Sequence, residues 1–422
     1  NTTGDENTAV GSAALDANTT GGQNVAVGYL SLTRSTTASD NTAVGYAALE
    51  ANTTGALNTA VGRSALTANT TGVQNVAVGR SALITNTTGP NNTAIGYEAM
   101  YYNTTGGGNT AVGHTALVNN TTGYSNQAFG FLALNDNTTG HSNTGIGESA
   151  LALNTTGVKN VGVGNNALDA NTTGYEQCAI GYNTLGANTT GYRNHGFGTE
   201  SLLLNTTGYD NAACGKSAIQ NNTTGAGNTA VGNYALQKNT TGIENVAIGY
   251  TAGDAITTGS NNIIIGSGAD VSAADGSGAN VLGRNVSGAA GYTTLGSGSD
   301  DIRAAHGNVT WATVSDERVK KDIEDSTVGL NFINDLRPVT FSYKNKGDLP
   351  TEFRGYEEGS TEVYKSEKSQ HGFIAQEVKA AIDKHSDIKN GFSMWDDNDE
   401  TGQQRVGETA LIPMLTKAVQ EL

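Results

Sequence analysis

Apolar and polar residues recur on a fixed 17-residue period from residue 7 to residue 266. The repeat is clearest from residue 58, where NTAVGRSAL is followed by TANTTGVQ. It starts sixteen times without an insertion, first at Asn7 and last at Asn262, and its fifth residue is Gly every time. A short, fixed period of this kind predicts a solenoid, in which each repeat forms one coil that packs against its neighbours.

Four columns of the repeat, numbered from its first Asn, carry the apolar pattern. Position 4 is Val, Ile, Phe or Cys, position 9 is nearly always Leu, and positions 3 and 8 are small. We expect these columns to stack in the core of a mainly β fold. The string NTAVG predicts one strand, and the segment around the Ala-Leu pair predicts a second. NTTG predicts a turn in which Asn and Gly supply the positive φ angles.

One Leu per coil makes a thin core for a single chain. Three chains around one axis would give each Leu or Val further partners, so we expect a homotrimeric β-roll or β-solenoid. The strings NTAVG (Asn41–Gly45) and NVAIG (Asn245–Gly249) resemble the head repeats of trimeric autotransporter adhesins. That resemblance implies a trimeric stack of β coils. The family's repeat is shorter than 17 residues, so the cross-section and handedness of its coil do not carry over.

Two outer columns of the repeat are candidates for binding. Position 6 varies most and should point away from the core. Position 16 holds Tyr175, Tyr192 and Tyr209 in consecutive coils, so their rings should stack about 5 Å apart. The ladder could bind sugars of a receptor or simply stabilise the fibre. The NTT strings match N-glycosylation acceptors, but their spacing of one coil favours a hydrogen-bonded Asn/Thr ladder.

The period breaks after Gly266. We interpret residues 267–314 as a neck or tip that caps the shaft of residues 1–266, with strand-like pieces at Asn280–Gly283 and Tyr292–Leu295. Tyr292, His306 and Trp311 are candidate receptor contacts at this tip. Trp311 could instead plug the axis of a trimer.

Charge and composition exclude several classes of function. The net charge of −16 argues against a nucleic-acid surface, and no apolar run is long enough to insert into a membrane. Cys178 and Cys214 lie on the lattice, where we expect small core residues without a redox role. Asp396–Glu400 lacks the Gly of a calcium loop, so we expect neither a metal nor a cofactor. The chain opens within a repeat, which suggests that more protein precedes residue 1.

Residues 315–422 have an ordinary globular composition and form the third predicted domain. Helical spacing is found at residues 330–336, 374–382 and 410–422, and Pro338–Tyr343 predicts a strand. In the last helix, Ala410, Leu411, Leu415, Val419 and Leu422 have coiled-coil-like spacing. Pro413 is tolerable there only near the start of the helix. We therefore expect a small α+β domain that ends in a helical coiled coil.

Three strings of this domain carry a second resemblance. SDERVKKDI (Ser315–Ile323), LRPVTFSYK (Leu336–Lys344) and HGFIAQEV (His371–Val378) resemble, in the same order, the intramolecular chaperone domain of endosialidase-type phage tailspikes and tail fibres. The resemblance implies a domain that templates trimerisation of the preceding fibre and then cuts itself free as a self-cleaving peptidase.

The resemblance also implies site residues. Ser315 would be the nucleophile and Lys320 the base, with Val314–Ser315 as the scissile bond and Asp316 and Arg318 as positioning residues. The chemistry is sound, because a Ser hydroxyl needs a base and a desolvated, neutral Lys can serve. Lys321 is an alternative base. SDERVKK could also be only a helix start with Ser315 or Asp316 as its N-cap. His371 could act as a base, although a structural role in a strand is the simpler interpretation.

The sequence thus predicts a homotrimeric phage tail fibre, located in the virion and attached to it through protein before residue 1. Its partner would be a host cell-surface receptor, which we expect to be a glycan, with no nucleic acid partner and no membrane insertion. Self-cleavage would be its only enzymatic activity. A bacterial surface or vesicle adhesin, located outside the cell, is the alternative. A polysaccharide-cleaving tailspike is disfavoured, because the shaft has no inward pair of carboxylates.

Overall fold

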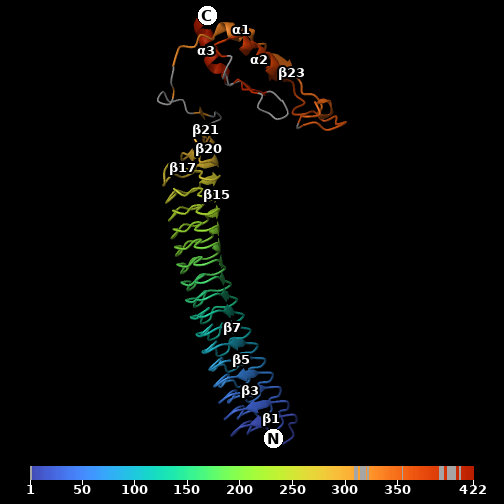
Figure 1. Cartoon of the computed structure of the whole chain (residues 1–422), viewed down its shortest axis with the longest axis vertical. Helices are drawn as coiled ribbons and strands as arrows, with labels where there is room; N and C mark the ends of the chain where they lie inside the picture. Colours follow the sequence, from blue (N-terminus) through green and yellow to red (C-terminus); the bar gives the residue numbers. More distant parts are fainter. Residues whose placement is uncertain are drawn as a thin grey trace. The chain divides into compact units, whose positions relative to one another are not determined.

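The structure is a computed structural model of the chain, and it divides into two compact units, Asn1–Val314 and Ser315–Leu422, each described by itself (Figure 1). The residues it describes are 2–307, 312–313, 320, 323–353, 355–388, 394–396, 405–407 and 410–422. No helix among these is long and apolar enough to cross a membrane.

The first unit contains a β-solenoid with one three-residue strand in each coil, at positions 2 to 4 of the repeat (Figure 1). These strands are β1 (Thr8–Val10), β2 (Val25–Val27), β3 (Thr42–Val44), β4 (Thr59–Val61), β5 (Val76–Val78), β6 (Thr93–Ile95), β7 (Thr110–Val112), β8 (Gln127–Phe129), β9 (Thr144–Ile146), β10 (Val161–Val163), β11 (Cys178–Ile180), β12 (His195–Phe197), β13 (Ala212–Cys214), β14 (Thr229–Val231), β15 (Val246–Ile248) and β16 (Ile263–Ile265). The predicted mainly β solenoid is confirmed.

The strands pair in parallel, each residue with its equivalent in the next coil. Val161, for example, pairs with Cys178, which pairs with His195. The segment around the Ala-Leu pair is a turn, so the prediction of a second strand there is wrong. The physical reason is backbone conformation: Ser64 at position 7 and Leu66 at position 9 have φ angles of 59° and 52°, which curl the chain.

The core of each coil is closed by one chain alone. Ala60 at position 3 and Ala65 and Leu66 at positions 8 and 9 are fully buried, and their equivalents repeat this in almost every coil. Position 4 is never buried, and our assignment of that column to the core is wrong. Side chains of a strand alternate between its two faces, so an inward residue at position 3 turns position 4 outward. Burial of Leu therefore does not require three chains.

Two columns of buried Asn connect the coils. At position 12, Asn69 donates from Nδ2 to Oδ1 of Asn52 at 2.9 Å and to the carbonyl of Gly72 at 3.0 Å. The same pattern runs unbroken from Asn52 to Asn239. At position 1, the backbone N–H of Asn58 donates to Oδ1 of Asn41 at 3.0 Å. The predicted hydrogen-bonded ladder is confirmed.

Glycine serves two different purposes in the repeat. Gly113 at position 5 has φ +145°, and a Cβ there would lie 2.3 Å from the carbonyl oxygen of Gly130 in the next coil. Gly123, at the end of NTTG, does not have a positive φ, contrary to our prediction. A Cβ at Gly123 would instead lie 2.3 Å from Oδ1 of Asn120 and 2.4 Å from the Gly140 carbonyl. This second column is glycine because the Asn ladder leaves no space.

The neck continues the same sheet and then ends it. Its strands are β17 (Asp270–Val271), β18 (Asn280–Arg284), β19 (Ser287–Gly288), β20 (Tyr292–Ser297), β21 (Asp300–Ala305) and β22 (Ala312–Thr313). β18 and β20, both expected from the sequence, extend the parallel ladder beyond β16, and β17 pairs with β19. β21 then pairs antiparallel with β20, and β22 pairs antiparallel with β21. The change of direction covers the edge that the parallel stack would leave open.

The Leu column stops at the junction between shaft and neck. Position 9 becomes Gly253 and then Asp270, whose carboxylate accepts hydrogen bonds from the backbone N–H groups of Ala255 and Val271 at 2.9 and 2.8 Å. Burial, together with a hydrogen bond to the Asp254 carboxyl, raises the pKa of Asp270 to about 6. The second carboxylate of this pair, Asp254, has its Oδ2 3.8 Å from Nζ of Lys238.

The second unit is a small α+β structure. Its elements are α1 (Leu330–Asp335), β23 (Val339–Phe341), a 3-10 helix (Lys346–Asp348), β24 (Gln370–Gly372), α2 (Ala375–Lys384), β25 (Trp395–Asp396), β26 (Arg405–Val406) and α3 (Leu411–Glu421). Phe332, Val378, Ile382, Met394 and Leu411 share its apolar core. The three expected helices and the expected strand are present, and Pro413 lies in the first turn of α3.

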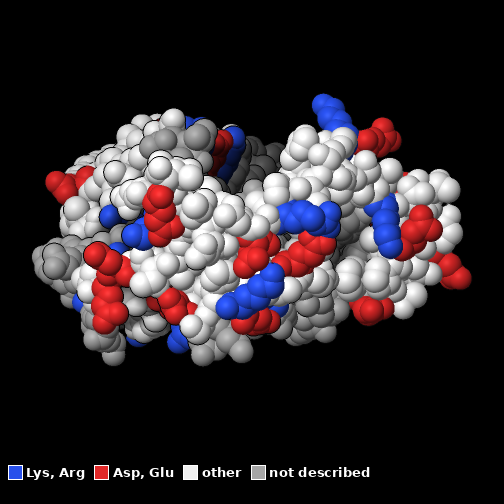
Figure 2. Space-filling view, turned by 90° about the horizontal axis from the view of Figure 1, so that it is seen from above, with Lys and Arg blue, Asp and Glu red and all other residues white. Residues whose placement is uncertain are grey.

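Charges of both signs are mixed on the surface. In the view of Figure 2, Lys and Arg lie beside Asp and Glu, with wide uncharged areas between them. In the second unit, His385 and Lys384 lie 3.0 and 3.2 Å from Asp335, and these contacts lower the pKa of its carboxyl.

The Asn ladder should be indispensable to local stability. Asn120→Ala removes bonds to Asn103, Gly123 and Asn137, leaving buried polar atoms unpaired. We expect the free energy of local opening in these coils to fall by about 2 kcal/mol or more. Hydrogen–deuterium exchange of the backbone amides in these coils measures this free energy. Asn165→Ala, which removes a solvent-exposed hydrogen bond to Glu148, is the matched control and should change this free energy by less than about 0.5 kcal/mol. Equal effects of both variants would contradict the prediction.

The shaft–neck junction should weaken as pH rises. Asp270 has a pKa near 6 in the folded state against 3.8 as its ordinary value, so the folded state binds this proton more tightly. The junction is therefore most stable below about pH 4 and loses this stability as pH rises to about 6. Hydrogen exchange of residues 250–275, corrected for intrinsic rates, should show the loss.

The Asp270→Asn variant provides the control for that measurement. It should remove the pH dependence while leaving the exchange of coils around residue 120 unchanged. A junction with the same pH dependence in both proteins would show that another group titrates there.

Candidate functional site

Two of the three strings of the second unit lie side by side as strands. β23 and β24 pair antiparallel, with Thr340 opposite His371, and Thr340 Oγ1 lies 3.1 Å from His371 Nδ1. The strings LRPVTFSYK and HGFIAQEV, about thirty residues apart in sequence, therefore form one structural element. His371 lies within a strand, in keeping with the structural role we favoured.

An ion pair joins the same two strings a second time. Arg337, just before β23, donates through Nε to Oε2 of Glu377 at 2.9 Å and through Nη2 to Oε1 of the same carboxylate. The guanidinium lowers the pKa of Glu377. The forked geometry fixes the direction of both side chains, so it holds the start of α2 beside the start of β23.

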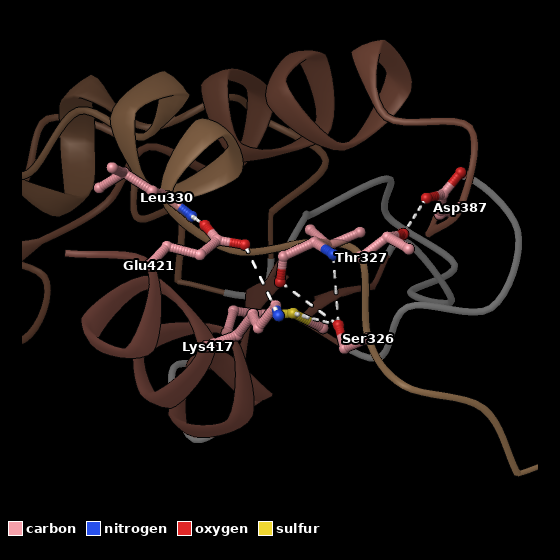
Figure 3. Close-up of polar contacts among 8 residues, drawn as sticks. Ser326, Thr327, Leu330, Asp387, Lys417 and Glu421 are labelled. Atoms are coloured by element: carbon pink, nitrogen blue, oxygen red, sulfur yellow. Dashed lines mark hydrogen bonds and ion pairs between the residues drawn. The ribbon is translucent and has the colours of Figure 1, made fainter.

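The last helix folds back onto the first (Figure 3). Glu421 Oε2 accepts a hydrogen bond from the backbone N–H of Leu330 at 2.7 Å, and Lys417 lies 3.9 Å from the same carboxylate. Ser326, before α1, donates weakly to the sulfur of Met414 at 3.9 Å. Thr327 donates to Asp387, and this bond lowers the pKa of that carboxyl. The segment from Ser326 to Leu330 is thus tied to α3.

The comparison with protein families covers the region in which these contacts lie. Residues 315–387 match the peptidase family described as "Chaperone of endosialidase". All three strings fall inside the matched range, and the match begins at Ser315. Comparison with curated proteins gives no match, and neither does comparison with solved structures. Residues 315–387, within the C-terminal unit, therefore match an endosialidase-type chaperone domain, and this unit follows a β-solenoid.

The predicted dyad lies at the start of the chaperone domain. Val314, Ser315, Asp316, Arg318 and Lys321 lie outside the described residues. Lys320 is described and is exposed in the single chain. The distance between the nucleophile and its base, and the choice between Lys320 and Lys321, therefore remain predictions from the sequence.

The chaperone domain exposes one apolar face of α3. Ile412, Leu415, Val419 and Leu422 are 62%, 46%, 71% and 89% exposed. Their spacing of three, four and three residues is that of a coiled-coil seam. Leu411, which we placed in this seam, is buried in the domain core, and Ile412 occupies the seam instead. α3 thus has two apolar faces, and among the described residues only the face with Leu411 packs into a core.

The Tyr ladder of the shaft has the stacking that the repeat predicts. Ring centroids of Tyr175 and Tyr192 lie 4.9 Å apart, and those of Tyr192 and Tyr209 lie 5.0 Å apart, with the planes within 8° of parallel. Arg193 Cζ lies 4.9 Å from the centre of the Tyr192 ring and its Nε lies 3.1 Å from Asp210. An aromatic column, exposed at Tyr175 and Tyr209 and half-buried at Tyr192, therefore runs beside a column of charges.

Two of the three tip candidates, Tyr292 and His306, lie among the described residues. Tyr292 begins β20, and Arg303 Cζ lies 5.7 Å from the centre of its ring. His306 Nε2 lies 3.3 Å from both Asn280 Nδ2 and Thr293 Oγ1. Trp311 lies outside the described residues.

Sequence reasoning named position 6 as a candidate binding column but did not predict that its side chains stack as a second ladder. Rings of Tyr29 and Tyr46 lie 5.5 Å apart, and Arg63 Cζ lies 5.7 Å from the centre of the Tyr46 ring. Further along, Tyr97 is placed between Arg80 at 5.5 Å and His114 at 5.0 Å. The signal was available: position 6 is aromatic or Arg in seven consecutive coils. Among the described residues, no three His, Cys, Asp or Glu side chains gather as metal ligands do.

Proposed function

We propose that the protein is a homotrimeric phage tail fibre whose C-terminal chaperone domain aligns three chains and then cuts itself from the fibre at Val314–Ser315. The observation that carries this proposal is an endosialidase-type chaperone domain that follows a solenoid of sixteen identical-length repeats and its neck. A receptor on the host cell surface, of glycan chemistry, would be the target of the fibre.

Trimerisation is supported by the chaperone domain itself. The outer seam of α3 offers four apolar side chains at coiled-coil spacing, and its other face is already packed in the core. Three such helices in parallel would bury the seam. This would bring three chains together at their C-terminal ends before the shaft forms.

The proposed cleavage is an attack within one chain. Oγ of Ser315 adds to the carbonyl carbon of Val314 while Lys320 Nζ accepts the hydroxyl proton. The bond from this carbon to the Ser315 nitrogen breaks, and the nitrogen leaves as an amine with a proton returned from Lys320. Water then hydrolyses the ester, giving a fibre that ends in the Val314 carboxylate and a domain that begins with Ser315.

Exposure of Lys320 suggests when this step occurs. A Lys that accepts a proton near neutral pH must be desolvated, yet Lys320 is exposed in the single chain. A surface from another chain would supply that desolvation, so we infer that cleavage follows assembly.

The Tyr column at the shaft surface supports glycan binding. Tyr175, Tyr192 and Tyr209 stack face to face, so the column presents ring edges and phenol hydroxyls beside Arg193 and Asp210, and these polar groups can hydrogen-bond the hydroxyls of a sugar. A bacterial surface or vesicle adhesin would use the same column. Antibody labelling of purified phage particles, compared with bacterial cells that lack the phage, would distinguish these two locations.

The cleavage prediction concerns four proteins. Purified wild-type chain should yield two fragments, one ending at Val314 and one beginning at Ser315, identified by mass spectrometry. Ser315→Ala and Lys320→Ala should remain full length, whereas Lys321→Ala should cut like wild type. Dilution before assembly should slow cleavage. Cutting of the Ser315→Ala chain at the same bond would contradict the proposed nucleophile.

The binding prediction concerns Tyr192. Tyr192→Ala should weaken binding of the fibre to host cells by roughly fivefold to tenfold, because the central ring of the column is lost. Tyr102→Ala, which removes an exposed Tyr at position 11, outside both candidate columns, is the matched control and should bind as wild type. Both are measured with fluorescent fibre on cells of a sensitive host. Unchanged binding by the Tyr192→Ala fibre would favour a purely structural ladder.

A further inference from the structure

The outward face of the shaft strands carries an unusual apolar column. We call the sixteen position-4 residues, from Val10 to Ile265, the strip; Leu282 and Leu295 continue it into the neck through the pairing of β16, β18 and β20. None of the sixteen is buried, and Phe197 and Ile248 are 43% and 40% exposed. All sixteen are nevertheless Val, Ile, Phe or Cys.

The exposure of position 4 does not by itself explain why the column is apolar. Position 6 is comparably exposed but holds Arg63, Glu148 and Lys216 among its residues. Strand propensity does not select it either. Position 2 lies on the same outward face of the same strands, and there Thr occurs in seven of sixteen coils. Thr is β-branched and suits a strand, yet position 4 never contains it. Some constraint other than strand formation therefore excludes polar side chains from the strip.

We propose that the strip is the surface along which three copies of the shaft pack in register. This rests on the proposed trimer and says which face of the shaft forms it. The occupant must present a long apolar surface with the spacing of the coils, about 4.8 Å, and another copy of the same strip does so. In a parallel arrangement with cyclic symmetry, each coil lies beside the equivalent coil of its partners. Every residue of the strip then packs against the same residue of the other chains.

The area of the strip fits this assignment. Monomeric proteins seldom expose contiguous apolar patches larger than a few hundred Å², whereas each partner of a stable interface contributes about 800 Å². Sixteen partly exposed apolar side chains, unbroken along the pairing from β1 to β16, approach the second figure rather than the first.

One residue of the strip can serve as a cross-linking probe of the proposed interface. Cys214 is the position-4 residue of β13 and has a free, exposed thiol. In a Cys178→Ala background it is the single thiol, and three copies packed along the strip bring three Cys214 side chains together. A short bismaleimide should then join chains in high yield. The matched control carries Cys178→Ala, Cys214→Ala and Lys216→Cys, which moves the thiol to position 6 of the same coil.

Three results are possible with the full chain, whose mass in solution is measured by light scattering. Trimeric protein that is joined at least tenfold more efficiently through Cys214 than in the Lys216→Cys control supports the assignment. Trimeric protein in which the control is joined as well or better overturns it and leaves the proposed trimer intact. Monomeric protein overturns both.

A pair of variants tests the same face without a reagent. Ile180→Asp places a charge on the strip, and Tyr182→Asp places it at position 6 of the same coil, where Ile180 and Tyr182 have similar exposure. Ile180→Asp should lower the melting temperature of the shaft, followed by circular dichroism, and Tyr182→Asp should not. Equal melting temperatures in trimeric protein would show that position 4 does not lie in the interface.

Discussion

Each coil of the shaft satisfies its buried polar groups with atoms of neighbouring coils. The amide of Asn69 bonds to Asn52 in the coil before it, and the carbonyl of Gly72 accepts from both Asn69 and Asn58. An isolated coil would leave these atoms buried without partners, at a cost of about 1–3 kcal/mol each. One coil therefore has no stability of its own, and the stack forms only as a row of mutually dependent neighbours.

The same regularity leaves the register of the coils unspecified within the shaft. Leu, Ala and Asn columns that repeat every 17 residues allow a shift by one whole repeat at the loss of only the end contacts. The junction is where the repetition stops, because Gly253, Ile256 and Asp270 replace the Leu and Asn that the columns require. A shaft that is nucleated from this end has a defined first coil. The chaperone domain lies on the same side of the shaft in sequence, which is where a nucleus that sets the register is needed.

The sequence predicted which positions are equivalent far better than which way they point. Period, Leu column, Ala column and Asn ladder follow from repetition, since identical residues at identical spacing must stack. The orientation of position 4 did not follow, because an apolar residue on a strand suggests burial whether it faces the core or another molecule. The second strand was wrong for a different reason: Leu66 adopts a positive φ that its residue type disfavours, and only contacts with the next coil maintain it.

In the chaperone domain, the strings indicated the domain but not its contacts. Pairing of Thr340 with His371 and the fork of Arg337 on Glu377 depend on tertiary placement, which no local pattern encodes. The seam of α3 was displaced by one residue at its start, because Leu411 and Ile412 are equally apolar and only burial of Leu411 in the domain core distinguishes them.

The buried Asn ladder also leaves no room for glycosylation of the Asn residues that form it. Asn120 and its equivalents stand in N-T-T strings, which oligosaccharyl transferases of a secretory pathway recognise on nascent chains before folding. In the finished shaft, the same nitrogens are fully buried and each donates two hydrogen bonds. A single sugar would occupy a donor that the stack requires and would project into a space that contains the next coil. Glycosylation of these Asn residues before folding would therefore prevent the coils from stacking.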